Sequence, residues 1–407
     1  MDEGQHSRPP PTCIGRLPVE LVRMILSALP DVMSLQAAVL SCPLFYSAFL
    51  RAKTSVTTHV LLNRVDASVF PDAIAASESA EVRLQDKRAR SQSRSAIWDL
   101  SSQSREAVME PFRSRIRKAI EDFVARNLRQ RPTLPKSLSL KEALRLERFH
   151  SCVEQLAEQF AETTLAKCPG ARPQPGTTYQ ERCRIQRALY RFEIFRNLFG
   201  GPDRLLPIVP SEKKPLFFDN FPPWEIEQLG CIHDFLFRAI KPAFNDVAEH
   251  CIEWVAAGVE YAEDLEDALY AQYILTLGLE ELWRIARAEG YAERARVLCS
   301  GYTPQPTEDF LYDGLLYNAN EEHYNIRLAD LATHEDERVW VWQPPSADPD
   351  PGPVEVWKWA HYEETCAFWI YQADRRDLRE WGYVMWDWSR LDENDVFQEP
   401  WEAPGTN

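Results

Sequence analysis

Two groups of histidine and cysteine carry the side chains best suited to metal binding in this chain. Cys231 and His233 are separated by one residue, and His250 and Cys251 are adjacent. A zinc site is usually built from short paired spacings such as C-x-x-C or H-x-x-x-H, which let the donor atoms converge on one ion. The sequence contains neither spacing. We therefore expect no metal site and no cofactor, and we assign these four residues to the hydrophobic core or its rim.

The chain also lacks motifs for nucleophilic and phosphate chemistry. A G-x-S-x-G nucleophile elbow and a G-x-x-x-x-G-K-[ST] phosphate loop are both absent, and only 15 glycines are present. The carboxylate pairs Glu263-Asp264 and Glu266-Asp267 are typical of a solvated helix junction, whereas acid–base catalysis needs a defined pocket. We predict that the chain is not an enzyme and has no catalytic residues. An enzyme without a recognisable signature stays open as an alternative.

The charges of the chain are unevenly distributed. The formal net charge is −16, with an excess of basic residues in 1–200 and a larger excess of acidic residues in 201–407. A basic half is compatible with a nucleic-acid surface, with attraction between the two halves, or with solvated helix faces. The acidic half as a whole would be repelled by phosphates. We therefore do not expect nucleic acid as a partner.

Cysteine content and hydropathy indicate the compartment. Nine cysteines occur without a C-x-x-C pair, and this odd number is typical of reduced thiols rather than of a disulfide scaffold. The N-terminal residues lack the apolar core of a signal peptide. No run of 18 apolar residues is present to span a membrane. We expect a protein of the cytoplasm, the nucleus or both, with no membrane partner.

The N-terminal part of the chain has the pattern of three short helices. Pro18 suits the first position of a helix, where its missing N–H costs nothing, and apolar residues recur after it at helical spacing. Pro30 and Pro43 interrupt this pattern twice. We therefore predict a three-helix module over residues 16–52, preceded by a disordered tail over residues 1–15.

The rest of the chain predicts a larger helical body. Residues 53–110, rich in Ser, Ala, Arg and Gln, are interpreted as a connecting segment, with 77–104 as a mobile linker or a loosely ordered helix. Capping-box patterns begin two further helices at Ser139 and Thr178, because each is followed three residues later by Glu. No repeat of 20–50 residues is visible. We expect an all-α fold, in which the N-terminal module precedes an irregular multi-helix body over residues 111–407.

Tryptophans are concentrated late in the chain, where 12 of the 13 follow residue 220. Because buried aromatic side chains supply a large apolar area, this concentration predicts a compact C-terminal core. It is also compatible with a ligand or peptide groove lined by tryptophan.

Three arginines share one side of a predicted helix. Arg184, Arg187 and Arg191 are spaced i, i+3 and i+7 within the helix predicted over 179–199. Arginine favours planar, two-pronged pairing with carboxylates. We hypothesise that this side of the helix docks onto acidic residues of the C-terminal half, such as those at 260–267, and joins the two halves. A simple solvated face is the alternative.

Residues 17–51 resemble an F-box, the adaptor-docking motif of modular ubiquitin ligases. The resemblance rests on Leu17-Pro18, Glu20-Leu21, Ile25-Leu26, the acidic break at Asp31 and the run from Leu35 to Phe45. Many family members have a basic residue and a tryptophan in the third helix, where this chain has Cys42-Pro43-Leu44-Phe45-Tyr46. The remaining sequence is similar to fungal F-box-like proteins, which often combine a helical body with a late segment similar to Gly382–Asp387.

The resemblance implies that the chain is an interaction protein. In the family, the leucine-proline start and the apolar positions after it dock against a Skp-type adaptor of a cullin ubiquitin ligase. The matched positions in this sequence are Leu17, Pro18, Leu21, Ile25, Leu40 and Phe45. The resemblance thus implies a substrate receptor that links the adaptor to an unknown protein target.

The size of the module agrees with this implication. A three-helix unit of about 35 residues cannot bury all of its apolar surface alone. Apolar residues on two sides of the first helix would leave one side for a partner. Two alternatives remain for the same residues. They can form an ordinary helical cap on the body, and the chain can be a non-enzymatic structural or regulatory helical protein with a degenerate F-box and no ligase role.

Overall fold

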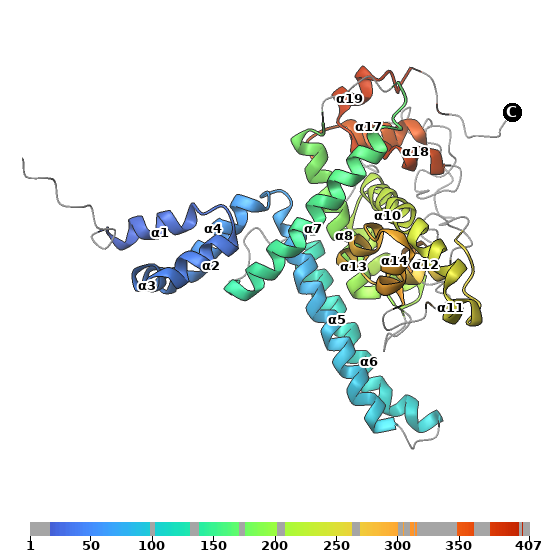
Figure 1. Cartoon of the computed structure of the whole chain (residues 1–407), viewed down its shortest axis with the longest axis horizontal. Helices are drawn as coiled ribbons and strands as arrows, with labels where there is room; N and C mark the ends of the chain where they lie inside the picture. Colours follow the sequence, from blue (N-terminus) through green and yellow to red (C-terminus); the bar gives the residue numbers. More distant parts are fainter. Residues whose placement is uncertain are drawn as a thin grey trace, which may run out of the picture. The chain divides into compact units, whose positions relative to one another are not determined.

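The structure is a computed structural model, and its described residues form helices, turns and loops without a β-strand (Figure 1). The described residues are 17–97, 102–130, 138–170, 176–201, 208–262, 269–299, 304, 310–312, 314–315, 348–361, 375–398 and 401. The all-α fold class is therefore confirmed, while the predicted tail at 1–15 lies outside these ranges. The chain divides into two compact units. Unit 1 is Met1–Phe70 with Leu134–His150, and unit 2 is Pro71–Thr133 with Ser151–Asn407.

Unit 1 contains the predicted module and one further helix. Its helices are α1 (Val19–Ser27), α2 (Val32–Ser41), α3 (Pro43–Arg51) and α4 (Lys53–Arg64). Asp31 caps α2 by accepting a hydrogen bond from the Ser34 N–H at 2.6 Å. α3 packs against α1 and α2, and α4 packs against all three. The three helices expected from the sequence are thus present, with α4 as a fourth member of the bundle.

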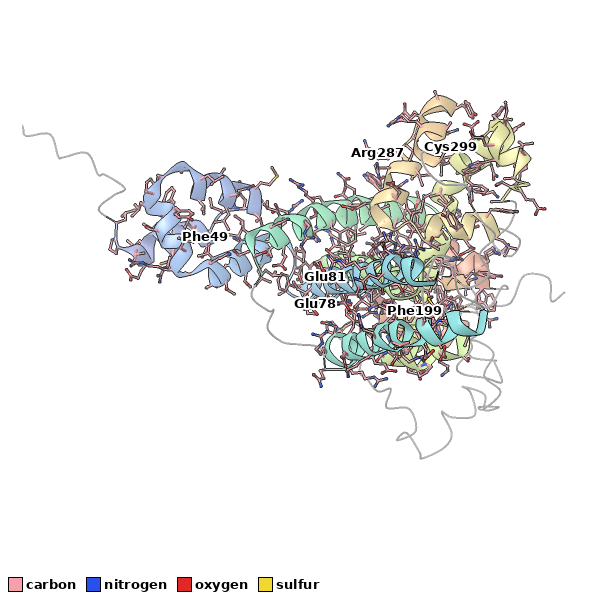
Figure 2. The ribbon with its side chains drawn as sticks, turned by 90° about the horizontal axis from the view of Figure 1, so that it is seen from below. Phe49, Glu78, Glu81, Phe199, Arg287 and Cys299 are labelled. Atoms are coloured by element: carbon pink, nitrogen blue, oxygen red, sulfur yellow. The ribbon has the colours of Figure 1, made fainter. Side chains whose placement is uncertain are left out.

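One side of each of these helices forms the core of unit 1. Val22 and Leu26 of α1, Leu35 of α2, Phe49 of α3 and Val60 of α4 are all buried. Figure 2 labels Phe49 within this bundle. The i, i+4 spacing of Val22 and Leu26 places both on the same side of α1. The core therefore takes only a stripe of α1 and leaves the rest of that helix outside it.

The helix α7 (Leu140–Leu165) begins in unit 1 and continues into unit 2. Its predicted capping box is present, since the Ser139 N–H donates to Glu142 at 2.8 Å and the Glu142 N–H donates to the Ser139 hydroxyl at 3.3 Å. Within unit 1, Glu147 accepts a hydrogen bond from the Val32 N–H at 2.7 Å. That bond satisfies one of the N–H groups left without a partner at the start of α2.

Two long helices occupy much of the segment that the sequence suggested as a connection. They are α5 (Phe70–Ile97) and α6 (Ser102–Val124), and a π-helical turn, η2 (Ala125–Arg129), follows α6. Asn127 donates to Glu78 of α5 at 3.0 Å, and the two helices lie side by side in both views (Figures 1 and 2). The composition of residues 53–110 explains the difference, because Ala, Arg and Gln are strong helix formers as well as common linker residues.

The centre of unit 2 is formed by α8 and α10. The elements here are α8 (Tyr179–Phe199), α9 (Pro210–Leu216), η3 (Phe218–Asn220) and α10 (Pro223–His250). The predicted capping box at Thr178 and Glu181 begins α8. Nearly every residue of α8 is buried, Arg184, Arg187 and Arg191 included, and α8 packs along α10.

Shorter helices surround α10. They are α11 (Ile252–Ala256), α12 (Leu269–Leu275), α13 (Leu279–Ala286), α14 (Gly290–Leu298), α17 (Gly352–Ala360), α18 (Arg376–Glu380), η6 (Tyr383–Met385) and α19 (Trp388–Glu393). Trp254, Trp357 and Trp386 are among the largest fully buried side chains, and Trp388 is 39% exposed. The described late tryptophans therefore contribute mostly to the core, as their concentration predicts.

Candidate functional site

Unit 1 exposes large apolar side chains on α1 to α4. Leu62 is the one on α4, and it is 39% exposed. The others lie on α1 to α3. The exposed apolar set consists of Leu21, Met24 and Ile25 on α1, Met33 and Leu40 on α2, and Tyr46 and Leu50 on α3. The exposed fractions run from 42% for Ile25 to 74% for Leu40. Single exposed apolar residues are normal on a protein surface. Seven of them on one small bundle indicate a surface suited to association.

The pattern of α1 explains why part of this set stays outside the core. Val22 and Leu26 are fully buried. Leu21 and Ile25 each precede one of these residues and therefore lie about 100° around the helix from it. Met24 stands three residues after Leu21, so all three exposed residues share a second side of α1. The helix is thus apolar on two sides, of which the bundle covers one.

The structure places the six predicted adaptor-binding residues at different depths. Leu21, Ile25, Leu40 and Pro18 are exposed, whereas Leu17 and Phe45 are half-buried. Leu21 and Ile25 lie together on α1. Leu40 lies in the last turn of α2, and Phe45 lies in the first turn of α3.

Sequence reasoning missed five exposed apolar residues of unit 1, namely Met24, Met33, Tyr46, Leu50 and Leu62. The spacing of Met24 could have identified it, because it stands three residues after Leu21 and therefore lies on the same side of α1. No sequence signal separates the exposed residues of α2 and α3 from the buried ones. The packing of α4 against these helices decides which of their apolar side chains remain outside.

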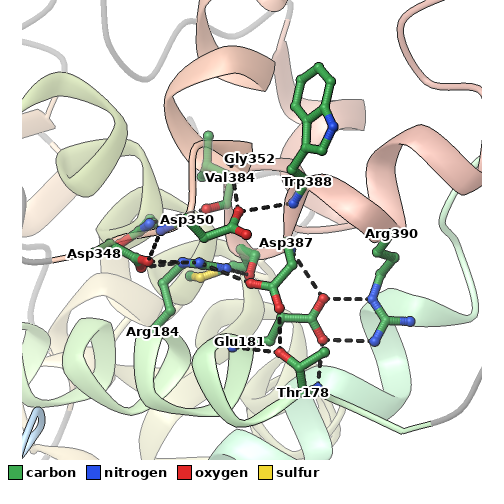
Figure 3. Close-up of polar contacts among 12 residues, drawn as sticks. Thr178, Glu181, Arg184, Asp348, Asp350, Gly352, Val384, Asp387, Trp388 and Arg390 are labelled. Carbon is green, nitrogen blue, oxygen red and sulfur yellow. Dashed lines mark hydrogen bonds and ion pairs between the residues drawn. The ribbon is translucent and has the colours of Figure 1, made fainter.

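Unit 2 encloses Arg184 of α8 among carboxylates (Figure 3). The Arg184 side chain is fully buried. Its Nε donates to Asp348 at 2.7 Å, and its Nη2 donates to Asp348 and to Asp387, each at 3.1 Å. Its Nη1 donates to the carbonyl oxygen of Met385. Arg184 therefore ties α8 to the chain on both sides of α17.

The other two arginines of this helix side are also paired. Arg187 donates to Asp348 at 2.8 Å. Arg191 forms ion pairs with Glu225 at 2.8 Å and with Asp72 at 3.4 Å. As hypothesised, these arginines bind acidic residues of the C-terminal half, namely Asp348, Asp387 and Glu225, whereas Asp72 belongs to the N-terminal half. Of the suggested segment at 260–267, the residues from 263 onward lie outside the described ranges.

The start of α8 is bound to α19 by a second charged contact (Figure 3). Glu181 accepts two hydrogen bonds from Arg390, from Nε and from Nη2, both at 2.7 Å. Glu181 also accepts from the N–H groups of Thr178 at 2.9 Å and Asp387 at 3.1 Å. The Thr178 hydroxyl donates to Asp387 at 2.5 Å. The Glu181 carboxylate thus caps α8 and also binds Asp387 and Arg390 of the C-terminal segment.

A further buried network lies on α10. Arg379 donates to Asp234 at 2.8 Å and to Glu227 at 3.2 Å. His233 contacts Asp234 through Nδ1 and Gln272 through Nε2, each at 3.1 Å. Both ring nitrogens of His233 therefore have protein partners. This histidine belongs to the core, where the sequence analysis placed it.

The arginines set the charge states of their partners. Burial alone would raise the pKa of Asp348, but the hydrogen bonds and charge of Arg184, with the charge of Arg187, outweigh it and lower that pKa. Burial raises the pKa of Asp387, against the opposing hydrogen bond from Thr178. The Glu181 carboxylate raises the pKa of Arg390. These groups are paired and hydrogen-bonded, and the pairs connect α8 to the residues on both sides of α17 and to α19.

The described residues do not suggest a metal site, because no group of three or more His, Cys, Asp or Glu among them is placed to hold an ion. No described helix combines the length and the apolar character needed to cross a membrane. Comparison with known proteins gave no relative: no family model, no curated protein and no solved structure matches this chain.

Proposed function

We propose that the chain is an F-box-type substrate receptor. Unit 1 would bind a Skp-type adaptor of a cullin ubiquitin ligase, and unit 2 would hold a protein target. The exposed apolar set of unit 1 carries this proposal. Leu21, Ile25 and Leu40 stand at positions that match the adaptor-binding positions of an F-box, and they are exposed by 43%, 42% and 74%.

Association of these side chains with a partner is physically favourable. Complete burial of one leucine or isoleucine side chain contributes about 1.5–3 kcal/mol. Protein interfaces commonly combine such an apolar centre with a polar rim. Glu20 is exposed and stands four residues before Met24 on α1, so it supplies a polar group at the edge of the exposed stripe.

Co-expression with a fungal Skp-type adaptor tests the proposal. The tagged wild-type chain is expected to co-purify the adaptor, and an Ile25→Asp/Leu40→Asp variant is expected to lose it. Leu62→Asp is the matched control, because Leu62 is 39% exposed on α4 and has no counterpart among the matched positions. This control variant should retain the adaptor. Circular dichroism melting of all three proteins establishes that the substitutions leave the fold intact.

Each other outcome has a defined meaning. A wild-type chain that fails to bind the adaptor favours the alternative function, a structural or regulatory helical protein with a degenerate F-box. Adaptor binding that survives Ile25→Asp/Leu40→Asp would show that the exposed apolar set is not the contact surface.

A further inference from the structure

A long stretch of the sequence of unit 2 contains acidic residues but no lysine or arginine, although Arg294 of α14 pairs with its Asp246. Between Lys241 and Arg284 the sequence has ten Asp and Glu and no Lys or Arg. This stretch covers the end of α10, the whole of α11 and α12, and the first part of α13. A concentration of one sign of charge creates a local potential that attracts groups of the opposite sign.

The helix α11 displays apolar side chains within this acidic stretch. Its Trp254 is buried and packs on Phe244, with 5.5 Å between the ring centroids. Ile252 is 84% exposed and Val255 is 58% exposed. Ile252 and Val255 are three residues apart and share a side of the helix, whereas Trp254 points away from them. The tryptophan therefore anchors α11, and the two aliphatic side chains face solvent.

The chain after α11 is fixed against the end of α10. Gly258 has a φ of 71°, which lets the chain turn back, and the Val259 N–H donates to the Trp254 carbonyl at 3.0 Å. Asn245 of α10 accepts from the Ala262 N–H at 3.0 Å and donates to the Ala262 carbonyl at 3.2 Å. The chain that follows α11 is thus attached to α11 through Val259 and to α10 through the side chain of Asn245.

Two exposed tyrosines and three exposed carboxylates complete this surface. Tyr261 is 46% exposed, and Tyr291 of α14 is 41% exposed with its ring 5.4 Å from that of His250. Glu249, Glu253 and Glu260 are exposed. We call the surface formed by the following residues the acidic apolar patch: Ile252, Val255, Tyr261, Tyr291, Glu249, Glu253 and Glu260.

We propose that the acidic apolar patch binds a basic amphipathic segment of a partner protein. Such a segment carries Lys or Arg along one side and aliphatic residues along the other. The aliphatic side would cover Ile252 and Val255, and the basic side would pair with the surrounding carboxylates. The tyrosine rings add faces on which cations stack. The same charge repels nucleic acid. The inference concerns unit 2 alone and does not depend on adaptor binding by unit 1.

A synthetic peptide tests the inference with the full-length chain. The probe is a fluorescein-labelled peptide of about 18 residues, or roughly five helical turns, made of Leu and Lys at helical spacing. Fluorescence anisotropy is measured at about 0.15 M NaCl, where the screening length is about 8 Å. The wild-type chain is expected to bind this peptide. A peptide with Glu in place of every Lys is expected not to bind.

Matched variants locate the binding surface. Ile252→Ser/Val255→Ser keeps every charge and should raise the Kd for the peptide about tenfold or more. Glu249→Lys/Glu253→Lys should have a comparable effect through charge. The control is Val209→Ser/Leu84→Ser, which alters residues of unit 2 that are 50% and 37% exposed outside the patch. This control should bind like the wild type, and tryptophan fluorescence melts verify that each variant is folded.

Three outcomes overturn the proposal. The first is a wild-type chain that does not bind the Lys-containing peptide. The second is an Ile252→Ser/Val255→Ser variant whose Kd equals that of the control, because binding would then be a diffuse attraction to a chain with a net charge of −16. The third is self-association in sedimentation velocity that only the Ile252→Ser/Val255→Ser variant abolishes, which would assign the patch to a second copy of the chain.

Discussion

The carboxylate of Asp348 accepts two hydrogen bonds from the guanidinium of Arg184, at 2.7 Å from Nε and 3.1 Å from Nη2, across 164 residues of sequence. The same carboxylate accepts a third bond, from Arg187 at 2.8 Å. Two buried cations of α8 therefore share one anion that lies just before α17, and Arg184 also pairs with Asp387. This arrangement joins the middle of unit 2 to its C-terminal part.

Removal of this anion should strongly destabilise unit 2. Asp348→Ala leaves Arg184 and Arg187 buried without their shared partner, and breaking a buried pair in this way costs about 3–5 kcal/mol. Urea unfolding followed by tryptophan fluorescence measures the loss, since every tryptophan lies outside unit 1.

An exposed ion pair gives the control for this experiment. Lys358 and Glu355 are 2.9 Å apart with side chains 50% and 41% exposed. Lys358→Ala should change the free energy of unfolding by about 0.5 kcal/mol or less. Equal effects of Asp348→Ala and Lys358→Ala would show that the buried network does not hold α8 in place.

Unit 1 should lose stability in mild acid because of His150. Burial, with the positive charge of Arg64, lowers the pKa of His150 from 6.5 to about 4. In the unfolded chain the imidazole takes up a proton below pH about 6.5, whereas in the folded unit it stays neutral down to about 4. The folded unit therefore has its full stability with respect to this histidine above pH 6.5. As the pH falls toward 4, the free energy of unfolding decreases by up to about 3 kcal/mol.

Comparison with His150→Leu isolates this effect from other titrations. The leucine variant keeps an apolar side chain at the site and removes the titrating group. The stability difference between wild type and variant should fall by about 1.4 kcal/mol per pH unit between pH 6 and 4. Hydrogen exchange of the amides in α1 to α4 reports on unit 1 specifically. If the stability difference between wild type and His150→Leu stays constant over this pH range, His150 is not the group that destabilises unit 1 in acid.

The sequence predicts α8 and its arginines but not their partners. The capping box at Thr178 and Glu181 and the spacing of the arginines are local features, so they can be recognised in a short window. Asp348 is one carboxylate among many in an acidic half, and only the tertiary fold selects it. The acidic residues at 260–267 had more local charge, which made them the stronger candidates from sequence alone.

In unit 1 and in α5, too, the local sequence pattern does not determine how the helices pack. Pro18, Pro30 and Pro43 delimit three helices, and all three are present. The depth of Phe45 and the exposure of Met24 depend on how the helices pack, and a single apolar pattern does not specify this. The long α5 lacks a strong apolar stripe and is made largely of helix-forming Ala and Arg, so its sequence resembles that of a linker.

A disulfide should form between Cys251 and Cys299 under oxidising conditions. The two sulfur atoms are 3.5 Å apart at the ends of α10 and α14. Reaction with oxidised glutathione converts the two thiols into one disulfide and releases two molecules of glutathione. Burial and the hydrogen bond to Cys251 raise the pKa of Cys299 to about 12, so the reaction should be slow at neutral pH and faster at about pH 9.

Peptide mapping by mass spectrometry identifies the linked pair. Closure of this loop should stabilise unit 2 by about 4 kcal/mol if the native geometry is kept. Cys299→Ser should remove both the linked peptide and the gain in stability. Cys231 is fully buried and should stay reduced in the same sample. Absence of the linked peptide at the higher pH would count against the pairing.

The glycine before η6 should be intolerant of a side chain for two separable reasons. Gly382 has a φ of 66°, and a Cβ added there would lie 2.9 Å from the ring of Phe160 in α7. Gly258 has a similar φ of 71°, but an added Cβ would meet nothing within 4 Å. Gly258→Ala should therefore cost only the backbone strain, about 1 kcal/mol. Gly382→Ala should cost a further 1–3 kcal/mol, roughly, from overpacking against Phe160.

Urea unfolding of both variants measures the difference, and equal losses would mean that the phenylalanine ring moves aside freely. A larger loss for Gly382→Ala would show that close packing of η6 against α7 stabilises the C-terminal part of unit 2.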